Sequence, residues 1–145
     1  MIKGLFQKLL NKSGKTYTID PQIPDSLIFY TLSRRGFMLV RGLFKTGKKV
    51  FVGNNTKIYN SGNFVFGKGV TIERHCIIDG YASRKIVLGN NAKIGAFSTL
   101  TSTSHFSKYG KGLQMGNNSA IGDFTHFGAA GGIEIGNDVI MGAYI

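Results

Sequence analysis

The sequence LGNNAKIGAFSTL at residues 88–100 returns in outline as MGNNSAIGDFTHFG at 115–128 and as IGNDVIMGAYI at 135–145. In each copy a large apolar residue recurs every six positions, a glycine follows most of these residues, and a small or β-branched residue stands four places after most of them. The large apolar residues of this pattern start earlier in the chain and occupy positions 52, 58, 66, 72, 78, 88, 94, 100, 115, 121, 127, 135 and 141. A fixed period over so much of a chain indicates a repeat architecture.

Each six-residue unit has the properties of one short β-strand. The small residue, four places after one large residue, stands two positions before the next large residue. Residues two positions apart point to the same side of a strand, so this small residue and the large residue after it share one face. The glycine marks a corner, because a backbone without Cβ turns at little steric cost. Three strands and three corners close a triangular coil of roughly 18 residues, and stacked coils form a parallel β-solenoid. We therefore expect Ile94, Ile121 and Met141 to stack in one column.

One corner of the predicted triangle varies in length. Each coil opens with an apolar-Gly motif, which is VGNN at 52, FGKG at 66, LGNN at 88, MGNN at 115 and IGND at 135. The return to the next opening motif takes ten residues from position 78, fifteen from position 100 and eight from position 127. Variable loops on one side of a solenoid mark its working side. The first coil does not fit this scheme, because the step from Phe64 to Phe66 is too short.

These motifs resemble the hexapeptide-repeat acyltransferases over roughly residues 50–145. The resemblance implies a mainly β fold, the left-handed parallel β-helix, and it looks most like the O-acetyltransferases that modify sugars in bacterial polysaccharide and lipopolysaccharide synthesis. It implies acetyl-CoA as the donor, a sugar or glycan hydroxyl as the acceptor, no metal, and a homotrimer with active sites between subunits.

Residues 1–49 lack the six-residue period and predict a basic, α-helical extension. Residues 1–12 place their apolar residues on one helical stripe, and we expect a second helix over about 25–45. Ten of the eighteen basic residues lie in residues 1–50, against two acidic ones. Two interpretations stay open and can coexist: the helices cap the solenoid, or residues 1–45 contact an anionic membrane surface. No apolar run is long enough to span a bilayer, and the start lacks the features of a signal peptide.

Net charge and cysteine content limit the partners and the compartment. The formal net charge of +11 favours phosphate-bearing partners, such as coenzyme A, an activated sugar or a phospholipid surface. We do not expect nucleic acid, because the basic residues after position 50 are dispersed and no aromatic stacking platform is evident. The single cysteine, Cys76, falls at an inward small position and predicts a buried thiol in a reducing compartment. We therefore expect a cytoplasmic protein, at the inner face of the membrane if the basic segment contacts lipid.

All three histidines, His75, His105 and His126, fall at positions that face away from the core. His105 is the catalytic candidate, because it lies in the long insertion TSTSHFSKYGKG at the variable corner. The family resemblance supports this choice, since sugar acetyltransferases of this fold carry a histidine about five residues after an apolar position and before an insertion. Imidazole titrates near neutral pH and can take the proton of a sugar hydroxyl as its oxygen attacks the thioester.

The resemblance also implies a cofactor groove, and it raises an objection to His105. Small corner residues allow the pantetheine arm of coenzyme A to approach the backbone, and the residues of this kind are Gly128, Ala129, Gly142 and Ala143. Many relatives carry their essential histidine one coil later, beyond the position of Ile145. Because the sequence stops at an inward apolar position, we expect a carboxy-terminally truncated β-helix. The base is then either His105 or a histidine beyond residue 145.

Two other functions stay open. A γ-type carbonic anhydrase shares the left-handed β-helix, but its zinc needs three converging imidazoles. The histidines here are thirty and twenty-one residues apart, whereas members of that family carry two of them five apart. The solenoid can instead serve as a non-catalytic scaffold or binding module.

Overall fold

The computed structural model describes residues 2–15 and 17–145. It begins with two helices, α1 (Ile2–Lys12) and α2 (Asp25–Thr46), and one short 3-10 helix follows later, η1 (Ser61–Asn63). Sheet 1 contains β1 (Phe51–Val52), β4 (Thr71–Ile72), β7 (Lys93–Ile94), β10 (Ala120–Ile121) and β13 (Ile140–Met141). Sheet 2 contains β2 (Lys57–Tyr59), β5 (Ile77–Asp79), β8 (Thr99–Thr101) and β11 (His126–Gly128). Sheet 3 contains β3 (Phe64–Phe66), β6 (Ile86–Leu88), β9 (Leu113–Met115) and β12 (Ile133–Ile135).

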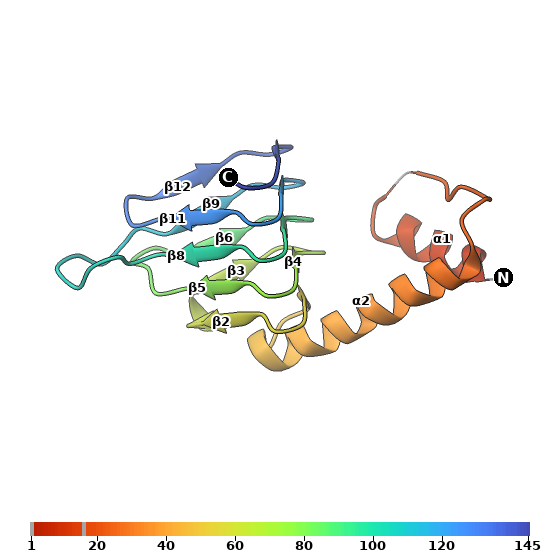
Figure 1. Cartoon of the computed structure of the whole chain (residues 1–145), viewed down its shortest axis with the longest axis horizontal. Helices are drawn as coiled ribbons and strands as arrows, with labels where there is room; N and C mark the ends of the chain where they lie inside the picture. Colours follow the sequence, from red (N-terminus) through yellow and green to blue (C-terminus); the bar gives the residue numbers. More distant parts are fainter. Residues whose placement is uncertain (1, 16) are drawn as a thin grey trace. The chain divides into compact units, whose positions relative to one another are not determined.

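The chain passes through sheets 1, 2 and 3 in turn and then starts a new coil, so neighbouring strands within a sheet are parallel (Figure 1). In sheet 1, Ile94 pairs with Ile121, and Ile121 pairs with Met141. The predicted parallel β-solenoid, its apolar column and the two amino-terminal helices are therefore confirmed. The left-handed sense of the coil stays a prediction.

Two details of the prediction were wrong: the first coil and the coil length. Val52 pairs with Ile72 in sheet 1, whereas Phe66 pairs with Leu88 in sheet 3, so VGNN does not share a face with the other opening motifs. The chain enters the solenoid on sheet 1, and the first coil is regular once β1 is placed there. Paired residues of successive coils are 20 positions apart for Val52 and Ile72 and up to 27 apart in later coils, not roughly 18.

The corner between sheets 2 and 3 takes up this extra length. We call it the insertion corner, and it consists of residues 60–63, 80–85, 102–112 and 129–132. The longest insertion, 102–112, protrudes from the stacked coils (Figure 1). The sequence therefore predicted the variable corner correctly.

The solenoid interior repeats by layer. Large apolar residues from all three sheets form one continuous core, and the small residues between them, including Cys76, Ser98, Ser119 and Thr125, are fully buried. The buried hydroxyls bond to the backbone, as when Ser119 Oγ donates to the carbonyl of Gly136 at 2.6 Å. These hydroxyl groups therefore keep hydrogen-bond partners although they are buried.

Where another coil follows on the same face, the glycine after a large apolar residue of sheets 1 and 3 serves the stacking of coils rather than a left-handed turn. A Cβ on Gly95 would overlap the carbonyl carbon of Gly122 in the next coil, whereas Gly128, Gly136 and Gly142 have open space at this position. The left-handed residue comes two places later, where Phe97 and Phe124 have φ of 58° and 57°. Such φ values are uncommon outside glycine and persist only where the surroundings hold them.

Asparagine side chains link the coils at the corner between sheets 3 and 1. Asn117 Oδ1 accepts a hydrogen bond from the Asn90 backbone N–H at 2.8 Å, and Asn137 Oδ1 accepts one from Asn117 at 2.7 Å. The Gly-Asn pair in the opening motifs thus supplies a bond between layers that strand pairing does not provide.

The chain divides into two compact units within α2, between Phe37 and Met38. In the second unit, the last turns of α2 contact the first coil, because Arg41 donates from Nη1 to the Val52 carbonyl at 2.7 Å. At Gly42 the helix approaches the Val50 carbonyl so closely that no Cβ fits between them. These are the contacts of a capping element. None of the described helices combines the length and apolar character needed to cross a bilayer.

Candidate functional site

The insertion 102–112 is anchored to the coil that precedes it. Ser102 Oγ donates to the Asp79 carbonyl at 2.7 Å, and Thr103 Oγ1 donates to the Tyr81 carbonyl at 2.7 Å. Thr103 Oγ1 also accepts a hydrogen bond from the Gly110 N–H at 3.0 Å, which closes the base of the insertion. Hydrogen bonds between the two hydroxyl groups and the backbone therefore hold both ends of this loop, while its tip extends into solvent.

A tight turn at the tip carries His105. The Lys108 N–H donates to the His105 carbonyl at 3.3 Å, and the pair forms an isolated antiparallel bridge. Phe106, at the apex, is fully exposed. His105 is exposed, as predicted, but the cause is this turn and not a strand register, because β8 ends at Thr101.

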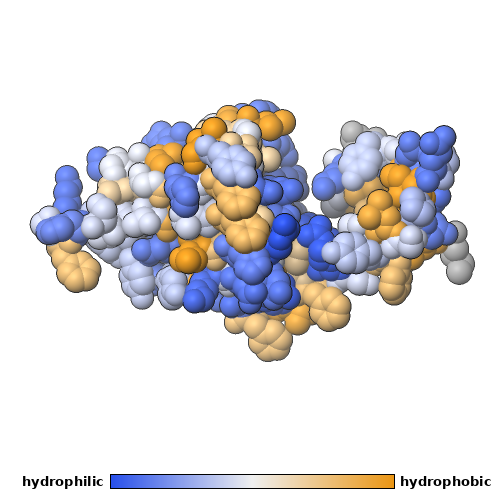
Figure 2. Space-filling view, viewed as in Figure 1, coloured by the Kyte–Doolittle hydropathy of each residue, from blue (hydrophilic) through white to orange (hydrophobic). Residues whose placement is uncertain are grey.

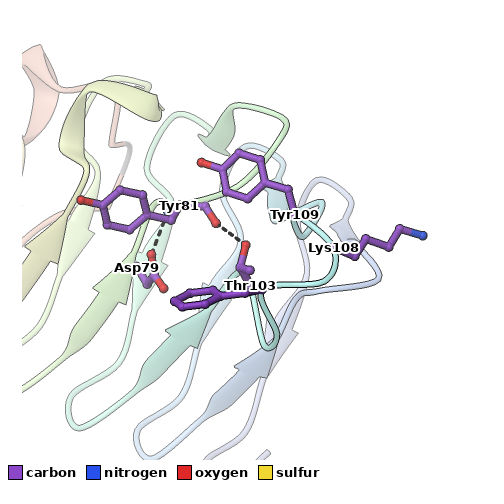
Figure 3. A pocket seen from close by; sticks show the side chains of 6 residues that line it. Asp79, Tyr81, Thr103, Lys108 and Tyr109 are labelled. Atoms are coloured by element: carbon purple, nitrogen blue, oxygen red, sulfur yellow. Dashed lines mark hydrogen bonds between the residues drawn. The ribbon is translucent and has the colours of Figure 1, made fainter.

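A cleft of about 450 Å³ lies beside this insertion, and its lining residues are Asp79, Tyr81, Thr103, Phe106, Lys108 and Tyr109. Asp79 is half-buried at the end of β5, and its Oδ1 accepts a hydrogen bond from the Tyr81 N–H at 2.7 Å. Figure 3 shows Asp79, Tyr81 and Thr103 joined by these bonds, while the Lys108 side chain extends away from them. The cleft thus combines a carboxylate, a hydroxyl and two exposed tyrosine rings.

His105 lies against a second hollow on the same insertion, which shares Thr103 and Phe106 with the cleft. Its Nδ1 accepts a hydrogen bond from the Ser107 N–H at 3.1 Å and lies 2.8 Å from Ser107 Oγ. A backbone N–H can only donate, so the neutral ring carries its proton on Nε2 and its lone pair on Nδ1. The basic nitrogen of His105 is therefore Nδ1, and Ser107 occupies it in this structure.

The predicted cofactor residues divide between two corners. Gly128 is exposed at the end of β11, and Ala129 is fully buried in the core. The Ala129 carbonyl accepts a hydrogen bond from Gly112 at 2.9 Å, so these two residues lie beside the His105 insertion. Gly142 and Ala143 follow β13 at the corner between sheets 1 and 2. Within one chain, the structure therefore brings Gly128 and Ala129, but not Gly142 and Ala143, to the corner of His105.

The other two histidines lie elsewhere on the solenoid surface. His126 projects from β11, with Nδ1 2.6 Å from Thr99 Oγ1 on β8, and His75 lies at the corner between sheets 1 and 2. Both are exposed, as the register predicted. Across residues 2–15 and 17–145, no three histidine, cysteine or carboxylate side chains gather as metal ligands.

An aromatic column that was not predicted from the sequence lies at the corner between sheets 1 and 2. His75 stacks on Phe97, Phe97 on Phe124 and Phe124 on Tyr144, with ring centroids 4.8, 5.0 and 5.0 Å apart. Arg74 adds a cation–π contact to Phe97. A signal was present, because each ring stands three places after an inward residue of sheet 1.

Cys76 is confirmed as a buried thiol. Burial raises its pKa, and its Sγ donates to the Gly95 carbonyl at 3.2 Å. A thiol held in its protonated form is a poor nucleophile.

The lining of the cleft was also missed. Asp79 and Tyr81 follow Ile78, the third inward position of their coil. The side chains that lie next to them come from the insertion of the next coil, and the sequence does not show how that insertion folds back.

Comparisons with protein-family models, with curated proteins and with solved structures find no match for this chain.

Proposed function

We propose that the chain is an acyltransferase that moves an acetyl group from acetyl-CoA to a hydroxyl of a sugar in cell-surface polysaccharide or lipopolysaccharide synthesis. The observation that carries the proposal is the coincidence of three features at one corner of a three-sided parallel solenoid. These are the longest insertion, an exposed histidine and a polar, aromatic cleft. The motif resemblance supplies the reaction class.

The proposed reaction needs no covalent enzyme intermediate. The acceptor hydroxyl displaces both Ser107 groups, the hydroxyl and the backbone N–H, from His105 Nδ1 and gives its proton to that nitrogen as its oxygen attacks the thioester carbonyl. The new C–O bond forms, the tetrahedral oxyanion collapses, and the C–S bond breaks. The departing thiolate takes the proton from the imidazolium, so the histidine returns to its neutral form.

The cleft supports a sugar as the acceptor. The Asp79 carboxylate accepts hydrogen bonds from hydroxyl groups, and tyrosine rings such as Tyr81 and Tyr109 offer an apolar face and a polar tip. In the proposal, Gly128 stays a candidate for backbone approach by the donor. The Ala129 methyl group is enclosed in the core, so only its backbone can take part. Gly142 and Ala143 reach a common groove only if another subunit of the proposed homotrimer brings its own corner there.

The test is release of free thiol from acetyl-CoA by the purified chain, measured with a panel of sugar acceptors. We expect His105→Ala to lower kcat/KM by about 100-fold or more, the usual contribution of a general base. His126→Ala is the matched control, because His126 is also exposed and hydrogen-bonded through Nδ1, and we expect it to keep the wild-type rate.

Ser107→Ala separates the two groups that contact His105. It removes the hydroxyl and keeps the backbone N–H, so we expect it to retain most of the activity. Loss of activity in His126→Ala alone would move the base to β11 and leave the reaction class intact. Absence of acceptor-dependent thiol release, together with no binding of coenzyme A by calorimetry, would leave the scaffold function as the better interpretation.

A further inference from the structure

The first compact unit, which ends at Phe37, buries few apolar side chains. Among residues 2–15 and 17–37, only Leu10 and Ile28 are buried. Seven large apolar side chains of the same stretch are between 46% and 70% exposed, and these are Leu5, Leu9, Tyr17, Leu27, Phe29, Tyr30 and Phe37. Figure 2 shows such apolar side chains (orange) among hydrophilic ones on the surface of this part of the chain. This density of exposed apolar groups calls for a partner.

Polar contacts hold the unit together from within. Gln7 on α1 donates to the Tyr17 carbonyl and accepts from the Ile19 N–H, at 3.0 and 2.9 Å. Lys3 lies 3.9 Å from Asp25 at the start of α2 and donates to the Pro21 carbonyl. These bonds orient the two helices without burying the outer apolar side chains, so the exposed set is a feature of the folded unit.

The exposed apolar side chains on α1 lie next to basic ones. Leu5 and Leu9 are one turn apart, and so are Lys8 and Lys12, which places the two pairs on adjoining stripes of the helix. Residues 1–37 contain six basic side chains and two acidic ones. A leucine stripe bordered by lysines is the pattern of a helix that lies in the headgroup region of an anionic bilayer.

We propose that this unit docks the protein on an anionic phospholipid surface, with Leu5, Leu9, Phe29 and Tyr30 entering the interface. These four side chains are the interfacial set. The charge of the unit decides among possible occupants, because a second copy of this chain carries the same positive excess and would repel it, whereas anionic lipid attracts it. Aromatic side chains such as Phe29 and Tyr30 suit the boundary between headgroups and acyl chains. The proposal is independent of the acyltransferase function.

Co-sedimentation of the full chain with lipid vesicles tests the proposal. We expect binding to vesicles that mix phosphatidylcholine and phosphatidylglycerol, at least tenfold weaker binding to phosphatidylcholine alone, and weakening as salt screens the charges. Leu5→Ser/Leu9→Ser and Phe29→Ser/Tyr30→Ser should each reduce binding at least tenfold. Val65→Ser/Ile77→Ser is the matched control, because these side chains are equally exposed but belong to the solenoid, and it should bind as wild type.

A second readout does not depend on disrupting the unit. The chain contains no tryptophan, so Leu9→Trp introduces a single reporter. Its emission should shift to the blue on addition of phosphatidylglycerol vesicles, whereas Val65→Trp should not respond. Equal binding to both vesicle types, no blue shift, or wild-type binding by both serine variants would overturn the proposal. Light scattering that shows a dimer dissociated by Leu5→Ser/Leu9→Ser, without vesicle binding, would assign the surface to a second copy.

Discussion

At the scale of single residues, Cys76 couples stability to pH. Its folded pKa is raised by burial, so the folded state holds the thiol proton more tightly than the unfolded chain does. The stabilisation is fully present below the ordinary pKa of a thiol and is lost as the pH rises from there through the raised pKa of the folded state.

The free energy of unfolding should therefore fall more steeply in wild type than in Cys76→Ala as the pH rises above about 8.5, the ordinary pKa of a thiol. Urea denaturation at a series of pH values measures this difference, and the alanine variant also controls for the titration of lysines and tyrosines. Parallel profiles for the two proteins would show that the thiol does not contribute.

At the scale of structural elements, the aromatic column stabilises the stacking of coils. Phe97 contacts a ring on each side, His75 at 4.8 Å and Phe124 at 5.0 Å, and its φ of 58° is left-handed. Two competing effects therefore meet at one residue: ring stacking, which favours phenylalanine, and backbone strain, which opposes it.

Phe97→Ala should lower the free energy of unfolding by about 1–3 kcal/mol, because two ring contacts are lost while the strained backbone stays. Phe97→Asn loses the same contacts, but asparagine tolerates the left-handed region, so it should be less destabilised than the alanine variant by up to ~1 kcal/mol. Phe106→Ala is the control, since that ring is fully exposed. Urea denaturation compares all three, and equal stability of Phe97→Ala and wild type would remove the column from the energetics.

At the scale of the whole molecule, the solenoid and the amino-terminal unit have different energetic roles. The continuous apolar core runs from Val50 to Ile135, and the last turns of α2 that contact it belong to the same compact unit. Each coil is stabilised mainly by its neighbours in a repeat fold, so removing a segment outside the stack should not unfold it.

A protein that contains residues 38–145 alone should thus keep the β-type circular dichroism spectrum and unfold cooperatively, with a midpoint within about 4 °C of the full chain. The same fragment should lose vesicle binding. Failure of the fragment to fold, with the full chain folded under identical conditions, would show that residues 1–37 are part of the stable core.

Much of the solenoid could be predicted from sequence because its rules are local. Alternation along a strand decided that Ile94 and Cys76 point inward and that His126 points outward. The six-residue period then implied three faces and one column of apolar residues. These conclusions need only the geometry of a strand and the burial of apolar side chains.

The tertiary structure alone decided the relations between coils. Val52 lies in sheet 1 because its strand pairs with the strand of Ile72, 20 positions later. Nothing in VGNN distinguishes this strand from the strands of sheet 3. Asp79 and Tyr109 came to one cleft because the insertion 102–112 folds back onto the preceding coil through Ser102 and Thr103. Sequence therefore determined which way each side chain faces, since that depends on the residue's own strand. Three-dimensional packing determined which side chains meet, because that depends on hydrogen bonds between segments of unequal length.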